Sequence, residues 1–75
     1  MEEFMKTMAA VSGEIWKVFK AACMDWQPKS EEWWEKVSND IDAAAKKYYG
    51  TEYEPYARAY AVELIYALER KAKGK

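Results

Sequence analysis

Two breaks in an otherwise helix-forming sequence constrain this chain most. The first is Gln27-Pro28-Lys29-Ser30, where Pro28 disfavours helix in the residue before it and Ser30 can cap the amides that follow. The second is Gly50, which suits the left-handed conformation after a helix. It is followed by the capping-box pattern Thr51 to Glu54, with Pro55 tolerated in the first turn. If Glu54 is instead the cap, the third helix begins later.

Apolar residues recur at helical spacing in all three segments that these breaks define. The stripe of the first segment comprises Phe4, Met8, Val11, Ile15, Val18, Phe19, Ala22 and Trp26. That of the second comprises Trp34, Val37, Ile41, Ala44, Ala45 and Tyr48. That of the third comprises Tyr56, Ala57, Tyr60, Ala61, Leu64, Ile65 and Leu68. The spacing predicts helices over about residues 3–25, 31–49 and 54–72.

Short connections make neighbouring helices antiparallel. The expected fold is therefore all-α, a small up-down-up three-helix bundle that forms one domain over residues 1–75. A chain of this size buries only ~60% of the surface that its unfolded form exposes, so its core must be rich in large side chains or shared with a partner. Aromatic residues make up 16% of the chain, and each large ring removes ~150–250 Å² from water.

The residue types that carry chemistry are scarce. The chain has no histidine, one cysteine and three scattered glycines. It therefore lacks the usual general base, the four ligands of a structural zinc site and a glycine-rich phosphate loop. We expect no enzymatic activity, no cofactor and no metal. The acidic residues that could suggest a cation site are interpreted as a solvated helix start favoured by the helix dipole, namely Glu31, Glu32, Glu35, Asp40 and Asp42.

The lone Cys23 cannot form an internal disulfide, which fits a reducing compartment. Because it lies beside the apolar stripe without an activating cation, we expect a partly buried, inert thiol. The N-terminus is acidic and lacks the apolar run of a secretory signal. No stretch approaches the ~18 apolar residues that span a bilayer. The predicted location is the cytoplasm, away from membranes.

Lysines on one face of the first helix and at the end of the second could contact phosphate or an acidic partner: Lys6, Lys17, Lys20, Lys46 and Lys47. The net charge of −1 and the neighbouring Glu2 and Glu14 weaken that interpretation. We therefore expect these lysines to form an ordinary solvated face, and a nucleic-acid partner is disfavoured.

Apolar residues also occur outside the three core stripes. Met5, Trp16 and Cys23 flank the first, Met24 lies nearly opposite it, and Ala59, Val62 and Tyr66 form a second face on the third helix. These residues either widen a small core or form a surface for protein binding or self-association. Tryptophan and tyrosine dominate such interfaces. The predicted contacts are Trp16, Trp33, Tyr49, Tyr53 and Tyr66.

Three short motifs carry a resemblance to a known group of proteins. Glu32-Trp33-Trp34, Lys46-Lys47-Tyr48 and the segment from Leu64 to Arg70 resemble small helical accessory proteins of Firmicutes phages and prophages, over about residues 31–73. The resemblance implies a mobile-element setting in the host bacterial cytoplasm and no catalytic residues. The predicted function is a non-catalytic protein-binding module, an inhibitor of a host defence protein such as a nuclease, as anti-CRISPR proteins are. The alternatives are a nucleic-acid accessory protein and a structural, weak homodimer.

Overall fold

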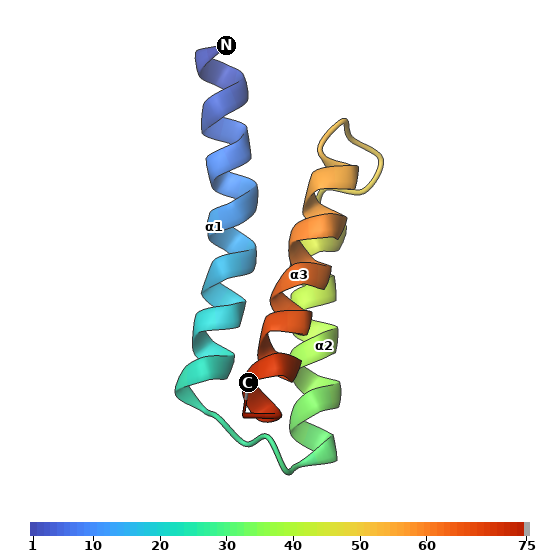
Figure 1. The fold of residues 1–75 in the computed structure, drawn as a ribbon. Helices are drawn as coiled ribbons and strands as arrows, with labels where there is room; N and C mark the ends of the chain where they lie inside the picture. Colours follow the sequence, from blue (N-terminus) through green and yellow to red (C-terminus); the bar gives the residue numbers. More distant parts are fainter. Residues whose placement is uncertain (75) are drawn as a thin grey trace.

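The chain folds into three α-helices that alternate in direction. The computed structural model describes residues 1–74, with α1 at Glu2–Met24, α2 at Glu31–Lys46 and α3 at Glu54–Ala72 (Figure 1). All three helices pack against one another. The predicted all-α three-helix bundle is therefore confirmed.

The largest difference from the predicted boundaries is the end of α2. Tyr48 and Tyr49 donate their backbone amides to the carbonyls of Ala45 and Lys46, at 3.1 Å each, which is the tight i to i−3 pattern of a turn. The helix thus ends three residues before the predicted position 49. Gly50 follows with φ of 84°, in the left-handed region that glycine adopts without strain.

The two interior helix starts differ in how they are capped. Ser30 caps α2 as predicted, because its hydroxyl oxygen accepts a hydrogen bond from the amide of Trp33 at 3.1 Å. The predicted capping box at α3 is wrong, because the helix starts at Glu54 after an N-cap residue, Tyr53, that makes no side-chain cap. The Thr51 hydroxyl accepts from the Tyr53 amide at 3.1 Å, and the Glu54 carboxylate accepts from the Gly50 amide at 2.9 Å.

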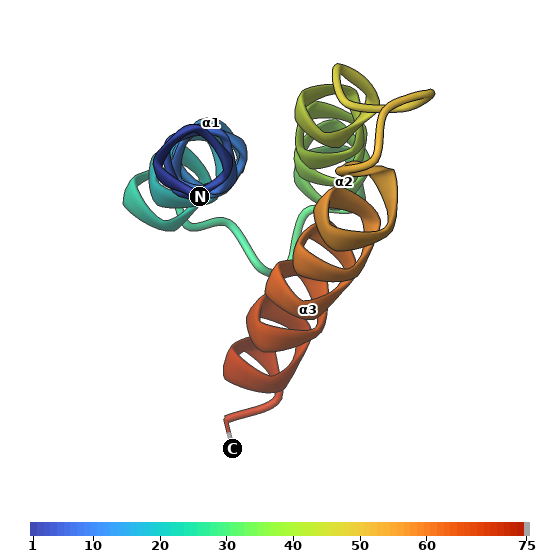
Figure 2. The ribbon, with the colours of Figure 1, turned by 90° about the horizontal axis from the view of Figure 1, so that it is seen from above.

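The core between the helices combines many small side chains with a few large ones, among them Trp33 and Leu68. Ile15, Ile41 and Val11 are the largest that are fully buried, and the buried set includes the alanines Ala22, Ala44, Ala45, Ala57 and Ala61. The first turns of α3 lie close to α2, whereas its last turns lie away from it (Figure 2). A thin core of this kind leaves much of each helix facing outward.

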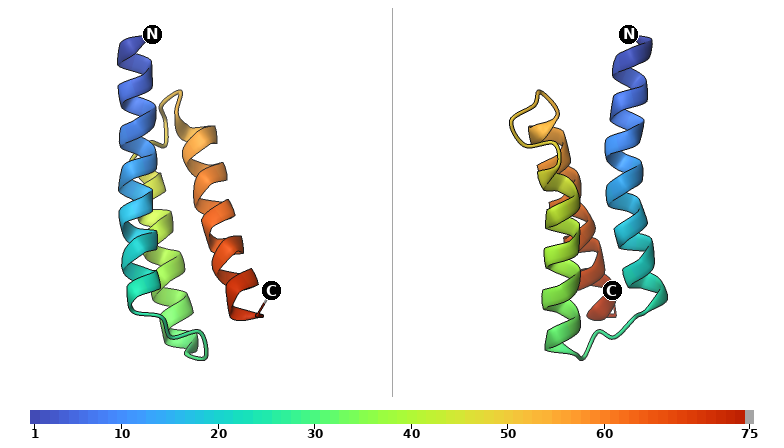
Figure 3. Two further views of the ribbon diagram at one scale, coloured as in Figure 1. Left: turned by 60° about the vertical axis from the view of Figure 1, so that its left-hand side comes forward. Right: turned by 180° about the vertical axis from the view of Figure 1, so that it is seen from behind.

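The molecule is longer and more open than its size requires. It measures 42 × 21 × 17 Å, and its radius of gyration is 13.1 Å against about 11 Å for a compact chain of this length. Its accessible surface of 5457 Å² exceeds the about 4,800 Å² typical of a monomer of this mass. With 23 residues against 16, α1 is about 10 Å longer than α2. Its first turns project beyond the α2–α3 connection (Figures 1 and 3).

This overhang explains a wrong prediction for the core. Phe4 lies on the predicted core stripe, yet 44% of it is exposed. Its ring meets only the edge of the bundle, where it stacks on Tyr53 with the ring centroids 6.1 Å apart. The periodicity places Phe4 on the correct side of α1, but α2 is too short to cover it.

A tryptophan cluster closes the other end of the bundle, beside the α1–α2 connection. Trp26 and Trp34 meet the ring of Trp33 edge to face, with centroids 5.2 and 4.8 Å away. Trp34 is half-buried and donates its indole N–H to the Pro28 carbonyl at 2.8 Å. Trp33, predicted as a partner contact, is thus a core residue, because Trp26 folds back from the end of α1 onto it. Trp34, predicted for the core, is half-buried against the core.

Candidate protein-binding surfaces

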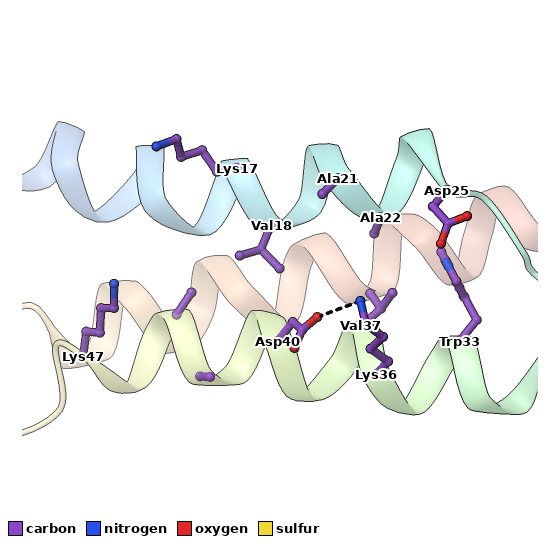
Figure 4. A pocket seen from close by; sticks show the side chains of 12 residues that line it. Lys17, Val18, Ala21, Ala22, Asp25, Trp33, Lys36, Val37, Asp40 and Lys47 are labelled. Carbon is purple, nitrogen blue, oxygen red and sulfur yellow. Dashed lines mark ion pairs between the residues drawn. The ribbon is translucent and has the colours of Figure 1, made fainter.

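A groove of about 640 Å³ runs between α1 and α2, with α3 behind the two helices (Figure 4). We call it the α1–α2 groove. Its floor is apolar. At the end near Asp25 it includes the ring of Trp33, and elsewhere it consists of small side chains: Val18, Ala21, Ala22, Val37, Ala43 and Ala44. An alanine side chain reaches only one carbon from the backbone, so these positions leave open the space that larger side chains would fill in a packed interface. Helical periodicity does not predict this groove, although the alanine pairs that line it, Ala21-Ala22 and Ala43-Ala44, can be recognised in the sequence.

The rim of the groove separates opposite charges. Figure 4 shows Lys17 and Lys47 at one end and Asp25 at the other. Between them, Lys36 and Asp40 form an ion pair of 3.4 Å along the α2 edge. Lys17 takes no part in the ion pairs found among residues 1–74. One end of the groove is therefore positive and the other negative.

Polar contacts hold α1 to the α2–α3 half of the bundle. The half-buried Tyr48 hydroxyl donates to the Glu14 carboxylate at 2.8 Å, and the Lys47 ammonium lies 3.7 Å from the same carboxylate. Burial raises the pKa of Tyr48, and the hydrogen bond and negative charge of Glu14 raise it further. Ser12 and the Tyr56 hydroxyl form a second hydrogen bond, between α1 and α3. These bonds fix how the three helices are placed.

Two apolar stripes lie on the outer surface, which is one of the two arrangements that the sequence allows. The α1 stripe consists of Met5, Trp16 and Cys23, and the α3 stripe of Ala59, Val62 and Tyr66; all six residues are exposed. Trp16 and Tyr66 are 48% and 50% exposed, which leaves about half of each ring free to contact another molecule. Their role as contacts stays a prediction.

The other three predicted contacts are positioned differently. Trp33 is only 6% exposed, so it belongs to the core and offers little surface to a partner. The rings of Tyr49 and Tyr53 are half-buried against the core. The Arg58 guanidinium covers the Tyr49 ring at 4.7 Å, a cation–π contact. Contacts within the chain therefore already use much of these two tyrosines.

The five lysines that could bind phosphate are mostly neutralised. Lys6 pairs with Glu2 at 3.6 Å, and Lys46 pairs with Asp42 at 3.0 Å, a bond that raises the pKa of Lys46. Lys47 lies beside Glu14, as described above. Lys17 and Lys20 are exposed on α1. Because carboxylates accompany three of the five, the lysines do not form the uninterrupted basic patch typical of nucleic-acid binding.

Cys23 and the carboxylates complete the sequence-predicted candidates. Cys23 is exposed, which corrects the expectation of a partly buried thiol; it lies too far around α1 from the core for α2 or α3 to cover it. Within residues 1–74, no three His, Cys, Asp or Glu side chains are grouped so that they could hold a metal ion. In the same part of the chain, no helix combines the length and apolar character that crossing a bilayer requires.

Comparisons with known proteins add no constraint on these surfaces. No family model, no curated protein and no solved structure matches the chain.

Proposed function

We propose that this chain is a protein-binding module that contacts its partner through the α1 and α3 stripes. The observation that carries the proposal is the exposure of large apolar side chains on these two stripes. Trp16, Tyr66, Met5 and Val62 are between 43% and 60% exposed. Exposed patches of large apolar side chains are typical of interaction sites.

The amount of free surface supports the same proposal. The accessible area of 5457 Å² is about 700 Å² more than a compact monomer of this mass exposes. A stable protein–protein interface covers about 800 Å² on each partner. The elongated bundle therefore has ample surface for one interface of this size.

The finer proposal is inhibition of a host defence protein in the bacterial cytoplasm. It rests on the resemblance to phage accessory proteins at Glu32-Trp33-Trp34, Lys46-Lys47-Tyr48 and Leu64 to Arg70. An inhibitor of this kind covers the working surface of its target and needs no catalytic group of its own. The exposed rings of Trp16 and Tyr66 suit such a role, because they bury a large area at a small cost in side-chain entropy.

Capture from a bacterial lysate tests the proposal. The tagged chain is used with and without nuclease treatment, beside a variant that combines Trp16→Ala with Tyr66→Ala and a control, Met24→Ala, whose side chain is exposed outside both stripes. We expect one stoichiometric protein that survives nuclease, is retained by the control and is lost by the double variant.

Three outcomes would contradict the proposal. Recovery that disappears with nuclease, or that falls steeply between about 50 and 200 mM salt, would favour a nucleic-acid partner. A protein retained equally by all three baits would show that the stripes are not the contact. A stable dimer in size exclusion without any captured protein would favour self-association.

A further inference from the structure

The α1–α2 groove lies outside both apolar stripes, and the function proposed above does not use it. We infer that this groove is the seat for a single α-helix of a protein partner, one that carries an acidic and a basic side chain about two turns apart. The inference goes beyond the proposed function because it concerns a separate surface, so either can fail without the other.

The position of the groove within the bundle favours a helical occupant. α1 and α2 form a pair, with α3 packed behind them in the view onto the groove (Figure 4). One side of the pair is therefore covered by α3, whereas no helix covers the side that carries the groove. A helix placed there would complete a four-helix arrangement, in which neighbouring helices lie 8–10 Å apart.

The floor of the groove suits close approach by a helix. Ala21 and Ala43 are exposed, Val18 is half-buried, and Ala22 and Ala44 lie beneath them. Small side chains on both walls allow the side chains of an incoming helix to sit between the two backbones. Because the floor is apolar, the matching face of the occupant must be apolar too, with residues at three- and four-residue spacing.

The charges on the rim define the rest of the occupant. Lys17 and Asp25 are eight residues apart on α1, which corresponds to about 12 Å along a helix. Lys47 adds to the positive end, although Glu14 offsets part of its charge. At the middle of the rim, the pair of Lys36 and Asp40 is already neutral. The complementary helix therefore places a carboxylate beside Lys17 and a cation beside Asp25.

Charge complementarity of this kind contributes more to specificity than to affinity. Exposed ion pairs each add only ~0–1 kcal/mol, so the apolar floor must supply most of the binding. The structure thus assigns two separable roles: the alanine and valine floor gives affinity, and the charges at the two ends select the partner.

A stapled peptide helix tests this inference directly. The probe carries leucine and alanine on one face, with glutamate and lysine eight residues apart on the rim of that face. A second probe has lysine at both rim positions and is otherwise identical. Each is titrated into the full-length ¹⁵N-labelled chain, and the amide resonances are followed. We expect the first probe to shift the amides of Val18, Ala21, Ala43 and Ala44.

Two tryptophan substitutions at exposed alanines form the matched pair for this titration. Ala21→Trp fills the groove and should weaken binding of the first probe at least about tenfold. Ala9→Trp should leave it unchanged, because Ala9 is exposed on α1 outside the groove and outside both stripes. Thermal unfolding of both variants establishes that each is folded. Lys17→Glu should reverse the preference between the two probes, because the positive end of the groove becomes negative.

Several results would overturn the inference. One is the absence of any shift at millimolar probe, and another is a set of shifts centred on Val62 and Tyr66. Equal binding by Ala21→Trp and Ala9→Trp would show that the groove is not the seat. Shifts of the groove amides that grow with protein concentration alone would assign the groove to a second copy of this chain.

Discussion

The two ends of the bundle use aromatic side chains in opposite ways. At the end where α1 joins α2, the rings of Trp26 and Trp34 enclose Trp33, which is only 6% exposed. At the other end, Phe4 stacks on Tyr53 and remains 44% exposed. The same class of residue is thus a core component at one end and a surface feature at the other.

Helix length and loop geometry produce this difference. The α1–α2 connection folds Trp26 back onto α2, whereas the first turns of α1 extend past the end of α2. The second end is instead held by polar contacts, from Tyr48 to Glu14 and from Ser12 to Tyr56. Burial therefore stabilises the first end, and hydrogen bonds position the second.

The largest expected effect is the loss of the buried tryptophan. Trp33→Ala should lower the free energy of unfolding by ~3–5 kcal/mol, because it removes a large ring from a packed cluster and leaves a cavity. Trp16→Ala, which truncates a half-exposed ring, should cost at most about 1 kcal/mol. Urea unfolding of both variants measures the two values. Equal losses would mean that burial does not separate the two tryptophans.

A smaller difference is expected between the two helix starts. Ser30→Ala removes the side-chain cap of α2 and should cost ~1 kcal/mol. Thr51→Ala should cost less, because Thr51 lies in an exposed turn and does not cap α3. Chemical denaturation of the pair gives the comparison. A larger loss for Thr51→Ala would show that the α2–α3 turn, rather than the first end, limits stability.

The overhanging end should tolerate truncation. We expect Phe4→Ala to lower the free energy of unfolding by less than about 1 kcal/mol, compared with ~3–5 kcal/mol for a fully buried phenylalanine. The measurement is thermal unfolding at two protein concentrations. A large loss that depends on concentration would indicate that a second copy covers this end in solution.

The polar end should respond to high pH. Because burial and the bond to Glu14 raise the pKa of Tyr48 in the folded chain, the fold favours the neutral phenol. The Tyr48 contact contributes fully to the free energy of unfolding below the pKa of an unfolded tyrosine, about 10. This contribution is lost as the pH rises through the pKa of Tyr48 in the folded chain. Stability of the wild type should fall more steeply from about pH 10 upward than that of Tyr48→Phe. If the stabilities of the wild type and Tyr48→Phe fall in parallel with pH, the contact between Tyr48 and Glu14 does not contribute to stability.

The sequence predicts the helices well and the surfaces only in part. Periodicity, Pro28, Ser30 and Gly50 are local signals, and they locate the three helices to within three residues. The stripes around Trp16 and Tyr66 follow from the same periodicity. Whether an apolar residue is covered depends on the neighbouring helix, and this non-local information is why Trp33 and Phe4 were misassigned.

The groove could not be predicted for the same reason. It requires that the alanines of α1 and α2 face each other at one level, and this depends on the relative position of the two helices. Its charged ends bring Lys17 near Lys47, which lie 30 residues apart in the sequence. A pattern read along one helix at a time contains no such pairing.

The most direct test of the account is the dissociation constant for the captured protein, measured by titration calorimetry. If Trp16 and Tyr66 anchor the interface, combining Trp16→Ala with Tyr66→Ala should weaken binding at least about thirtyfold, which corresponds to the ~2 kcal/mol cost of truncating an anchor. The unfolding free energy of the double variant should stay close to that of the wild type. An unchanged dissociation constant in a folded double variant would contradict the account.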